Sequence, residues 1–129
     1  MTDVILADRD THFAQACVRR FEEKGVRARY ACNGSTCLRL VEEEHPGVVI
    51  ISMALDGLAG FELVSRLREI PHVVRPFAIA IVALAPDPDD LRASRIYGCS
   101  GYFVRSYISI EAFIHRIHRM HLSLSRSSG

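Results

Sequence analysis

Continuous runs of apolar residues alternate along the chain with segments in which apolar residues recur at helical spacing. Three runs, Val4–Ala7, Val48–Ile51 and Ala78–Leu84, contain no polar side chain. Such runs are typical of strands buried on both faces of a parallel sheet. Residues 26–30 alternate apolar and basic side chains, which predicts an edge strand, and Gly101–Val104 predicts a short fifth strand.

A helical pattern follows each predicted strand. Asp10 is a suitable N-cap for a helix that carries Phe13, Cys17 and Phe21 on one face and stops at Gly25. The remaining predicted helices cover residues 36–44, about 60–69, 86–97 and 109–124.

The elements form a strand followed by a helix, repeated five times. This order predicts an α/β fold in three layers, with a five-stranded parallel sheet covered by helices on both faces. Right-handed crossovers leave few topologies, and the flavodoxin-like strand order 2-1-3-4-5 places the three most apolar strands in the centre. Pro71 and Pro76 bound a predicted loop, and we expect no second domain.

The composition is that of one globular domain. Of the 129 residues, 49% are hydrophobic and 24% are charged, which excludes disorder as the main state. No apolar run reaches the roughly 18 residues of a transmembrane helix. The first residues lack the basic and apolar segments of a signal peptide. We therefore expect a cytoplasmic protein with no membrane partner.

Charge is distributed unevenly along the chain, although the net charge is only +1. Residues 1–70 hold 9 basic and 11 acidic side chains, a net of −2, and residues 71–129 hold 7 basic and 4 acidic ones, a net of +3. The second part either presents a basic face to an acidic partner or has a solvated helix face. The small net charge and the lack of a helix-turn-helix pattern predict no direct binding to nucleic acid.

The sequence predicts no metal or cofactor site. Its four cysteines have neither C-x-x-C spacing nor a histidine at zinc-site spacing, which indicates mostly buried thiols. His115, His118 and His121 recur every third residue in the last predicted helix. No carboxylate or cysteine accompanies them, and their side chains fan around the helix axis.

Ligand sites in such sheets lie at the carboxyl ends of the central strands. Asp8 and Arg9 follow the first predicted strand, Ser52 ends the third, Ala85 follows the fourth and Arg105 follows the fifth. Over about residues 3–124, the chain resembles the receiver domain of bacterial two-component response regulators. The segments that carry the resemblance are Val4–Asp8, Val48–Ser52, Gly57–Leu63 and Gly98–Arg105. The resemblance implies a receiver-like domain at residues 1–124, and residues 125–129 are expected to form a flexible tail or the start of a linker.

The resemblance also implies which positions carry the family's chemistry. In the family, an aspartate ending the third strand is phosphorylated, two acidic residues after the first strand hold Mg²⁺, and a hydroxyl and a lysine contact the phosphoryl group. In this chain, Ser52 stands at the position of the phosphorylated aspartate, and Asp8 and Arg9 stand at the two acidic positions. Ala85 stands at the position of the hydroxyl and Arg105 at that of the lysine, so only Asp8 keeps the family's residue. We therefore expect a pseudo-receiver: a signalling module of a bacterial two-component-like pathway that acts independently of phosphorylation, without catalytic residues or a cofactor.

Other interpretations of this pocket stay open at the level of sequence. Asp56, in the loop after the third strand, is a candidate displaced acceptor that would keep the receiver active. Arg9 and Arg105, facing Ser52, would form a site for a small anion or metabolite. We expect a salt bridge of Asp8 with Arg9 and Arg105 where the family holds a metal, or else an exposed and unpaired Arg9.

Two further features follow from the resemblance. Tyr102 matches the family's aromatic switch, whose ring turns inward on phosphorylation; the alternative is a half-buried tyrosine with its hydroxyl at the rim. The fourth helix, fifth strand and fifth helix form the family's usual partner or dimer surface. On that surface this chain would offer arginines and tyrosines to another signalling protein or to a second copy of itself. The alternative is a face that is only solvated. These residues are Arg92, Arg95, Tyr97, Tyr107, Arg116 and Arg119.

Overall fold

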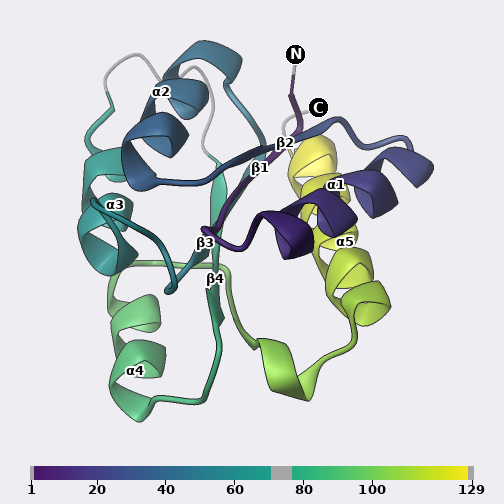
Figure 1. The fold of residues 1–129 in the computed structure, drawn as a ribbon. Helices are drawn as coiled ribbons and strands as arrows, with labels where there is room; N and C mark the ends of the chain where they lie inside the picture. The colour runs from purple at the N-terminus through teal and green to yellow at the C-terminus, as the bar shows by residue number, and fades with distance from the viewer. Residues whose placement is uncertain (1, 71–76, 128–129) are drawn as a thin grey trace.

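The computed structural model describes residues 2–70 and 77–127, and it confirms the predicted α/β architecture (Figure 1). Five parallel strands form one sheet in the predicted order β2-β1-β3-β4-β5. The strands are β1 (Val4–Ala7), β2 (Ala28–Ala31), β3 (Val48–Ser52), β4 (Ala78–Ala83) and β5 (Gly101–Val104).

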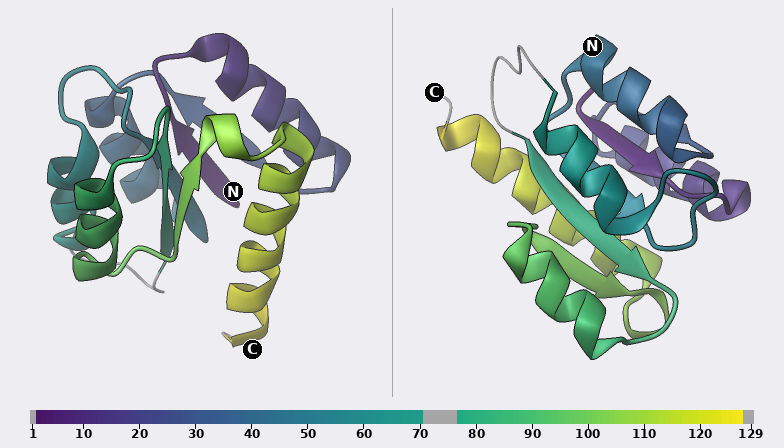
Figure 2. Two further views of the ribbon diagram at one scale, coloured as in Figure 1. Left: turned by 90° about the horizontal axis from the view of Figure 1, so that it is seen from below. Right: turned by 90° about the vertical axis from the view of Figure 1, so that its left-hand side faces the viewer.

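Helices cover both faces of the sheet. Helices α2, α3 and α4 lie on one face, and α1 and α5 lie on the other (Figures 1 and 2). The helices are α1 (Thr11–Glu23), α2 (Gly34–Glu44), α3 (Gly60–Arg68), α4 (Pro88–Ile96) and α5 (Ile110–Ser127), and the 3₁₀ turn η1 (Arg105–Tyr107) connects β5 to α5.

The continuous apolar runs are explained by two hydrophobic cores, one on each face of the sheet. Successive side chains of a strand point to opposite faces. In β1, Val4 and Leu6 pack with α1 and α5, whereas Ile5 and Ala7 pack with α2 and α3. Every residue of β1, β3 and β4 is therefore buried, and no position in these strands is left for a solvated side chain.

The predicted start signals act as caps in the structure. The Asp10 carboxylate accepts a hydrogen bond of 3.1 Å from the backbone N–H of Phe13 at the start of α1. Asn33 caps α2 in the same way through the N–H of Thr36, at 2.8 Å. Gly25 after α1 has a left-handed backbone with φ of 76°, a conformation that favours glycine.

Several predicted boundaries shift by one to three residues, and two of these differences matter here. Strand β4 ends at Ala83 rather than Leu84, because Ala83 is the last residue paired with β5, and the Leu84 side chain is exposed. Helix α5 continues through residues 125–127, which the sequence assigned to a tail. No glycine or proline precedes Gly129 there, so nothing in the sequence stops the helix earlier. The predicted loop at Pro71 and Pro76 lies outside the described residues.

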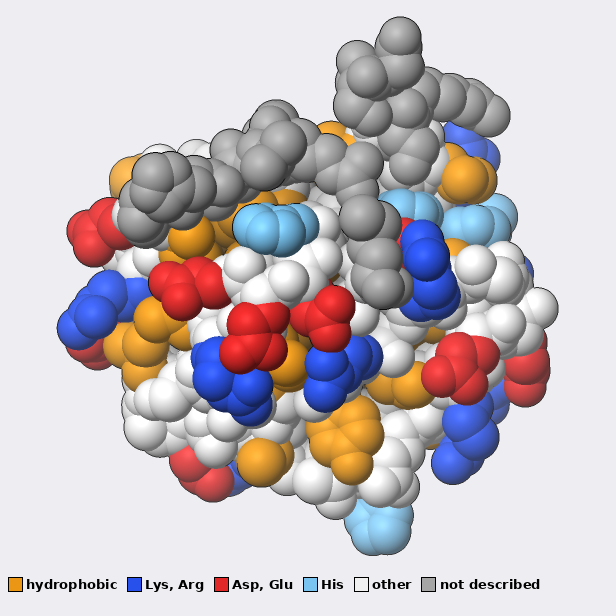
Figure 3. Space-filling model, turned by 90° about the horizontal axis from the view of Figure 1, so that it is seen from above, with side chains coloured by type: hydrophobic (Ala, Val, Ile, Leu, Met, Phe, Trp, Pro, Cys, Tyr) orange, Lys and Arg blue, Asp and Glu red, His pale blue; other side chains and the backbone are white. Residues whose placement is uncertain are grey.

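Figure 3 shows the end of the molecule where the strands begin, opposite the candidate site. Acidic and basic side chains are interspersed on this face, so neither sign of charge dominates it. One such pair is formed by Asp3 and Arg27, whose guanidinium Nε lies 3.1 Å from the carboxylate. In the described part of the chain, no helix combines the length and apolar character needed to span a bilayer.

Candidate functional site

The carboxyl ends of the neighbouring strands β1 and β3 bring Asp8 and Ser52 to the same end of the sheet. The preceding residue of β1, Ala7, pairs with Ile51 of β3, and Ser52 pairs with Val82 of β4. Asp8 is 0% exposed and Ser52 is 1% exposed. The sequence thus located this pocket correctly, and the structure shows that it is closed to solvent at these two side chains.

Asp8 is a buried carboxylate with one unsatisfied oxygen. Its Oδ1 accepts a hydrogen bond of 2.9 Å from the backbone N–H of Asp10. Its Oδ2 is buried and has no hydrogen-bond partner among the described residues. Burial raises the pKa of Asp8 because it penalises the charged form, and the Asp10 N–H and the Arg105 charge offset only part of this effect.

We expect the Asp8→Asn substitution to increase the free energy of unfolding at neutral pH. The folded protein binds a proton at Asp8 more tightly than the unfolded chain does, so the ionised carboxylate destabilises the fold. This penalty is absent below the ordinary pKa of 3.8 and grows as pH rises through the raised folded pKa. Urea denaturation from pH 4 to 7 checks it: the gain from the substitution must grow with pH, and a gain independent of pH would contradict it.

Ser52 ends β3 with a hydroxyl that is already engaged by the backbone. Its Oγ accepts a hydrogen bond of 3.1 Å from the backbone N–H of Ala54. A hydroxyl forms neither the acyl phosphate of a phosphorylated aspartate nor the carboxylate–Mg²⁺ bond. Because the side chain is buried, a separate kinase would reach it only after local opening of the fold.

Arg9 does not pair with Asp8, which corrects the predicted salt bridge. Its Nη1 lies 3.6 Å from the Asp56 carboxylate, and the two side chains are 60% and 70% exposed. Arg9 is therefore neither buried in the metal position nor unpaired. An exposed pair at this distance contributes little to stability. Asp56 lies in the loop after β3, where the structure places it against Arg9 and not in the buried pocket.

Arg105 pairs with Asp10 rather than Asp8. Its Nη1 donates to Asp10 Oδ2 at 3.2 Å, and its guanidinium lies 3.9 Å from the centre of the Phe13 ring. Asp10 thereby caps α1 with one oxygen and holds Arg105 with the other. Each arginine of the pocket is engaged by its own carboxylate, so the two-guanidinium anion site facing Ser52 is not assembled.

Ala83, and not Ala85, stands at the end of β4. The sequence placed Ala85 in the pocket, but β4 ends two residues earlier and Ala85 is exposed in the following loop. This correction leaves the chemical conclusion unchanged, because an alanine at either position supplies no hydroxyl for a phosphoryl oxygen.

The donor set of the pocket does not fit the Mg²⁺ ion that the family uses. Mg²⁺ requires near-octahedral oxygen ligands. Asp8 is the one carboxylate buried at the strand ends, Asp10 is committed to Arg105, and Arg9 adds a positive charge. No group of three or more histidine, cysteine, aspartate or glutamate side chains in the described residues is arranged to hold a metal ion.

Tyr102 points into the molecule. Its hydroxyl oxygen is buried, and its ring packs against the core under α2 and α3. Burial raises the pKa of Tyr102. Tyr102 is half-buried, as one interpretation expected, but its hydroxyl oxygen is enclosed rather than at the rim.

The surface around α4 is more apolar than the sequence analysis expected. All six predicted surface residues are exposed, but Tyr97 stacks on Phe61 of α3 at a ring distance of 5.3 Å, so it belongs to the boundary of α3 and α4. The sequence analysis missed the exposed side chains of Leu91 and Ile96. The weak amphipathic pattern of α4 could have indicated their exposure, because the helix buries only Ser94.

A model of the response regulator receiver domain family matches residues 4–118, which is most of the chain. The chain belongs to this family. Two relatives are similar to this chain over most of its length. The receiver is 31% identical over 109 residues to an uncharacterized 14.6 kDa protein from the sodA1 3′ region of Leptolyngbya boryana, covering 84% of this chain and 82% of that protein. It is 25% identical over 87 residues to the sporulation initiation phosphotransferase F of Bacillus subtilis, covering 67% and 68%.

Solved structures show the same fold at low identity. A CheY-like response regulator receiver domain protein from Methanospirillum hungatei superposes with a TM-score of 0.84 at 16% identity, covering 98% of each chain. The receiver domain of a LuxO repressor protein from Vibrio parahaemolyticus superposes with a TM-score of 0.86 at 12% identity, covering 98% of this receiver and 95% of that chain. The receiver fold of two-component signalling is thus retained while most of the sequence differs.

Proposed function

We propose that this receiver is a pseudo-receiver that signals by binding a protein partner, independently of aspartyl phosphorylation. The partner is another signalling protein or a second copy of the chain. The module acts in the cytoplasm of a bacterium in a two-component-like pathway, without catalytic activity, a cofactor, nucleic acid or membrane.

The observation that carries this proposal is the exposed apolar character of α4. The helix buries only Ser94, while Ile96 is 81% exposed and Leu91 is also exposed. A nine-residue helix is marginal in water without tertiary packing. A partner that covers α4 would supply the packing that the fold itself does not provide.

The neighbouring surface has the composition of an interface. We define the α4–β5–α5 surface by its exposed arginines and tyrosine, which are Arg92, Arg95, Tyr107, Arg116 and Arg119. Arginine and tyrosine are enriched at binding hot spots. The positive charge of these side chains fits an acidic partner surface.

The chemistry of the pocket supports phosphorylation independence. The acceptor position is a buried serine, Ser52, and the second acidic position is Arg9, which faces Asp56 at the surface. The Tyr102 hydroxyl is enclosed by the fold, which would restrict the ring to one orientation. A receiver with these residues would be held in one signalling state.

We expect Arg95→Glu combined with Arg119→Glu to abolish partner binding, with an affinity loss of about 30-fold or more for a hot-spot pair. Sedimentation velocity over a range of protein concentrations measures self-association, and affinity capture from native lysate with mass spectrometry measures binding to another protein. Arg19→Glu combined with Arg39→Glu is the matched control, because it makes the same charge change at two exposed positions outside the surface. A receiver that stays monomeric and captures no stoichiometric partner would contradict the proposal, as would equal loss in the control.

A further inference from the structure

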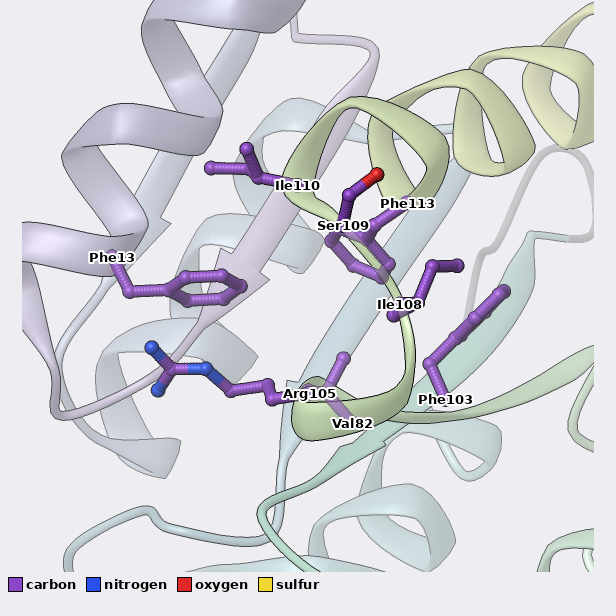
Figure 4. Close-up of a pocket in the computed structure, with 8 residues that line it drawn as sticks. All are labelled: Phe13, Val82, Phe103, Arg105, Ile108, Ser109, Ile110 and Phe113. Atoms are coloured by element: carbon purple, nitrogen blue, oxygen red, sulfur yellow. The ribbon is translucent and has the colours of Figure 1, made fainter.

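A cavity of about 220 Å³ lies between α1, the ends of β4 and β5, and the first turn of α5 (Figure 4). Its walls are mainly apolar. Three phenylalanines from three elements form most of its aromatic lining: Phe13 of α1, Phe103 of β5 and Phe113 of α5. The space opens to solvent on one side, so a small molecule can enter it without unfolding of the core.

The three rings form a rigid wall. Phe103 and Phe113 meet edge to face with 5.2 Å between their centres, and Phe13 lies 6.3 Å from Phe113. Phe103 and Phe113 are buried, whereas Phe13 is partly exposed and marks the mouth of the cavity. Ile108 and Ile110, on the segment that leads into α5, complete the apolar lining (Figure 4).

One cation reaches this apolar space. The Arg105 guanidinium lies against the Phe13 ring, and its side chain is 28% exposed (Figure 4). It donates one hydrogen bond, to Asp10, among the described residues, although a guanidinium has five N–H donors.

We propose that this cavity binds a small carboxylate with an aromatic body, its ring against the apolar lining and its carboxylate on Arg105. A cavity of about 150 Å³ is known to hold benzene, so 220 Å³ accommodates a ring with a short substituent. The planar guanidinium fork matches a carboxylate. The cavity adjoins the α4–β5–α5 surface, because Arg116 lies over the Phe103 ring at 5.4 Å. Arg105 and Ile110, which test the cavity, are not among the residues that define the surface, so failure of either proposal leaves the other standing.

The test compares benzoate with benzamide, which has the same shape without the charge. Titration of the full chain followed by ¹H–¹⁵N NMR should give saturable shifts of the Phe13, Phe103 and Ile110 amides with benzoate, and affinity for benzamide should be at least tenfold lower. Absence of saturable shifts with benzoate, or shifts that cluster elsewhere, would overturn the proposal. Equal affinity for the two probes would overturn the role of Arg105.

Two variants separate the charge from the cavity. Arg105→Gln should weaken benzoate binding at least tenfold, whereas Arg68→Gln should not, although Arg68 also lies over a phenylalanine ring, that of Phe77 at 5.7 Å. Ile110→Trp should abolish binding of both probes, because the larger side chain fills the cavity. This variant leaves Arg105 in place, so it still tests the cavity if Arg105→Gln disturbs the fold. Retained benzoate binding in Ile110→Trp would place the ligand outside the cavity and overturn the assignment.

Discussion

Incubation with acetyl phosphate and Mg²⁺ is expected to leave the mass of this receiver unchanged. The pocket holds one buried carboxylate, Asp8, and the acceptor position carries a serine. Without an aspartate nucleophile, no acyl phosphate bond can form. Without a second metal ligand, no Mg²⁺ ion is held to stabilise the negative charge of the phosphoryl group during transfer. Intact-protein mass spectrometry measures the outcome directly.

The double substitution Arg9→Asp with Ser52→Asp tests whether two added carboxylates are enough to allow phosphorylation. It places carboxylates after β1 and at the end of β3, so we expect Mg²⁺ binding and a phosphoryl adduct that hydroxylamine removes, as it does an acyl phosphate. Ser52→Asp alone should yield far less adduct, because Arg9 keeps its positive charge. A hydroxylamine-sensitive adduct on the unmodified chain would show that phosphotransfer survives, with Asp56 as the first position to map.

Replacement of Phe21 by alanine is expected to remove about 3–5 kcal/mol from the free energy of unfolding. Phe21 is 0% exposed in α1 and packs in the core shared by α1, α5 and the sheet. Domains are stable by about 5–15 kcal/mol, so this loss is a large fraction of the total. Urea denaturation followed by circular dichroism gives the value.

Tyr107→Ala is the matched control for that loss. It also removes an aromatic ring, but Tyr107 is 74% exposed in η1. We expect a change within about 0.5 kcal/mol. A loss at Phe21 no larger than the loss at Tyr107 would contradict the description of the core beneath α1.

The sequence predicted most of the fold because local patterns carried the information. The apolar runs at Val4–Ala7 and Val48–Ile51 could only be satisfied by burial on both faces of a sheet. The caps at Asp10 and Asn33 depend on hydrogen bonds to residues three positions along the chain. The end of β4 was misjudged because apolar character continues through Leu84, whereas pairing with β5 stops at Ala83.

The side chains at the candidate site were identified from sequence, but their partners were not. Arg105 and Asp10 are separated by 95 positions, and no periodicity relates them. Arg9 reaches Asp56 instead of Asp8 because its side chain extends to the surface and leaves the Asp8 carboxylate buried. The outcome depends on side-chain direction at each strand end, which local pattern does not encode.

The sequence by itself determined the strands that are buried on both faces and the serine at position 52, because periodicity and residue identity are local properties. The tertiary structure alone decided three other features: the separate carboxylate partners of the two arginines, the exposed apolar side of α4, and the cavity beside Arg105. Each of these depends on which side chains from distant segments fill the same space, and that is fixed only when the helices pack on the sheet.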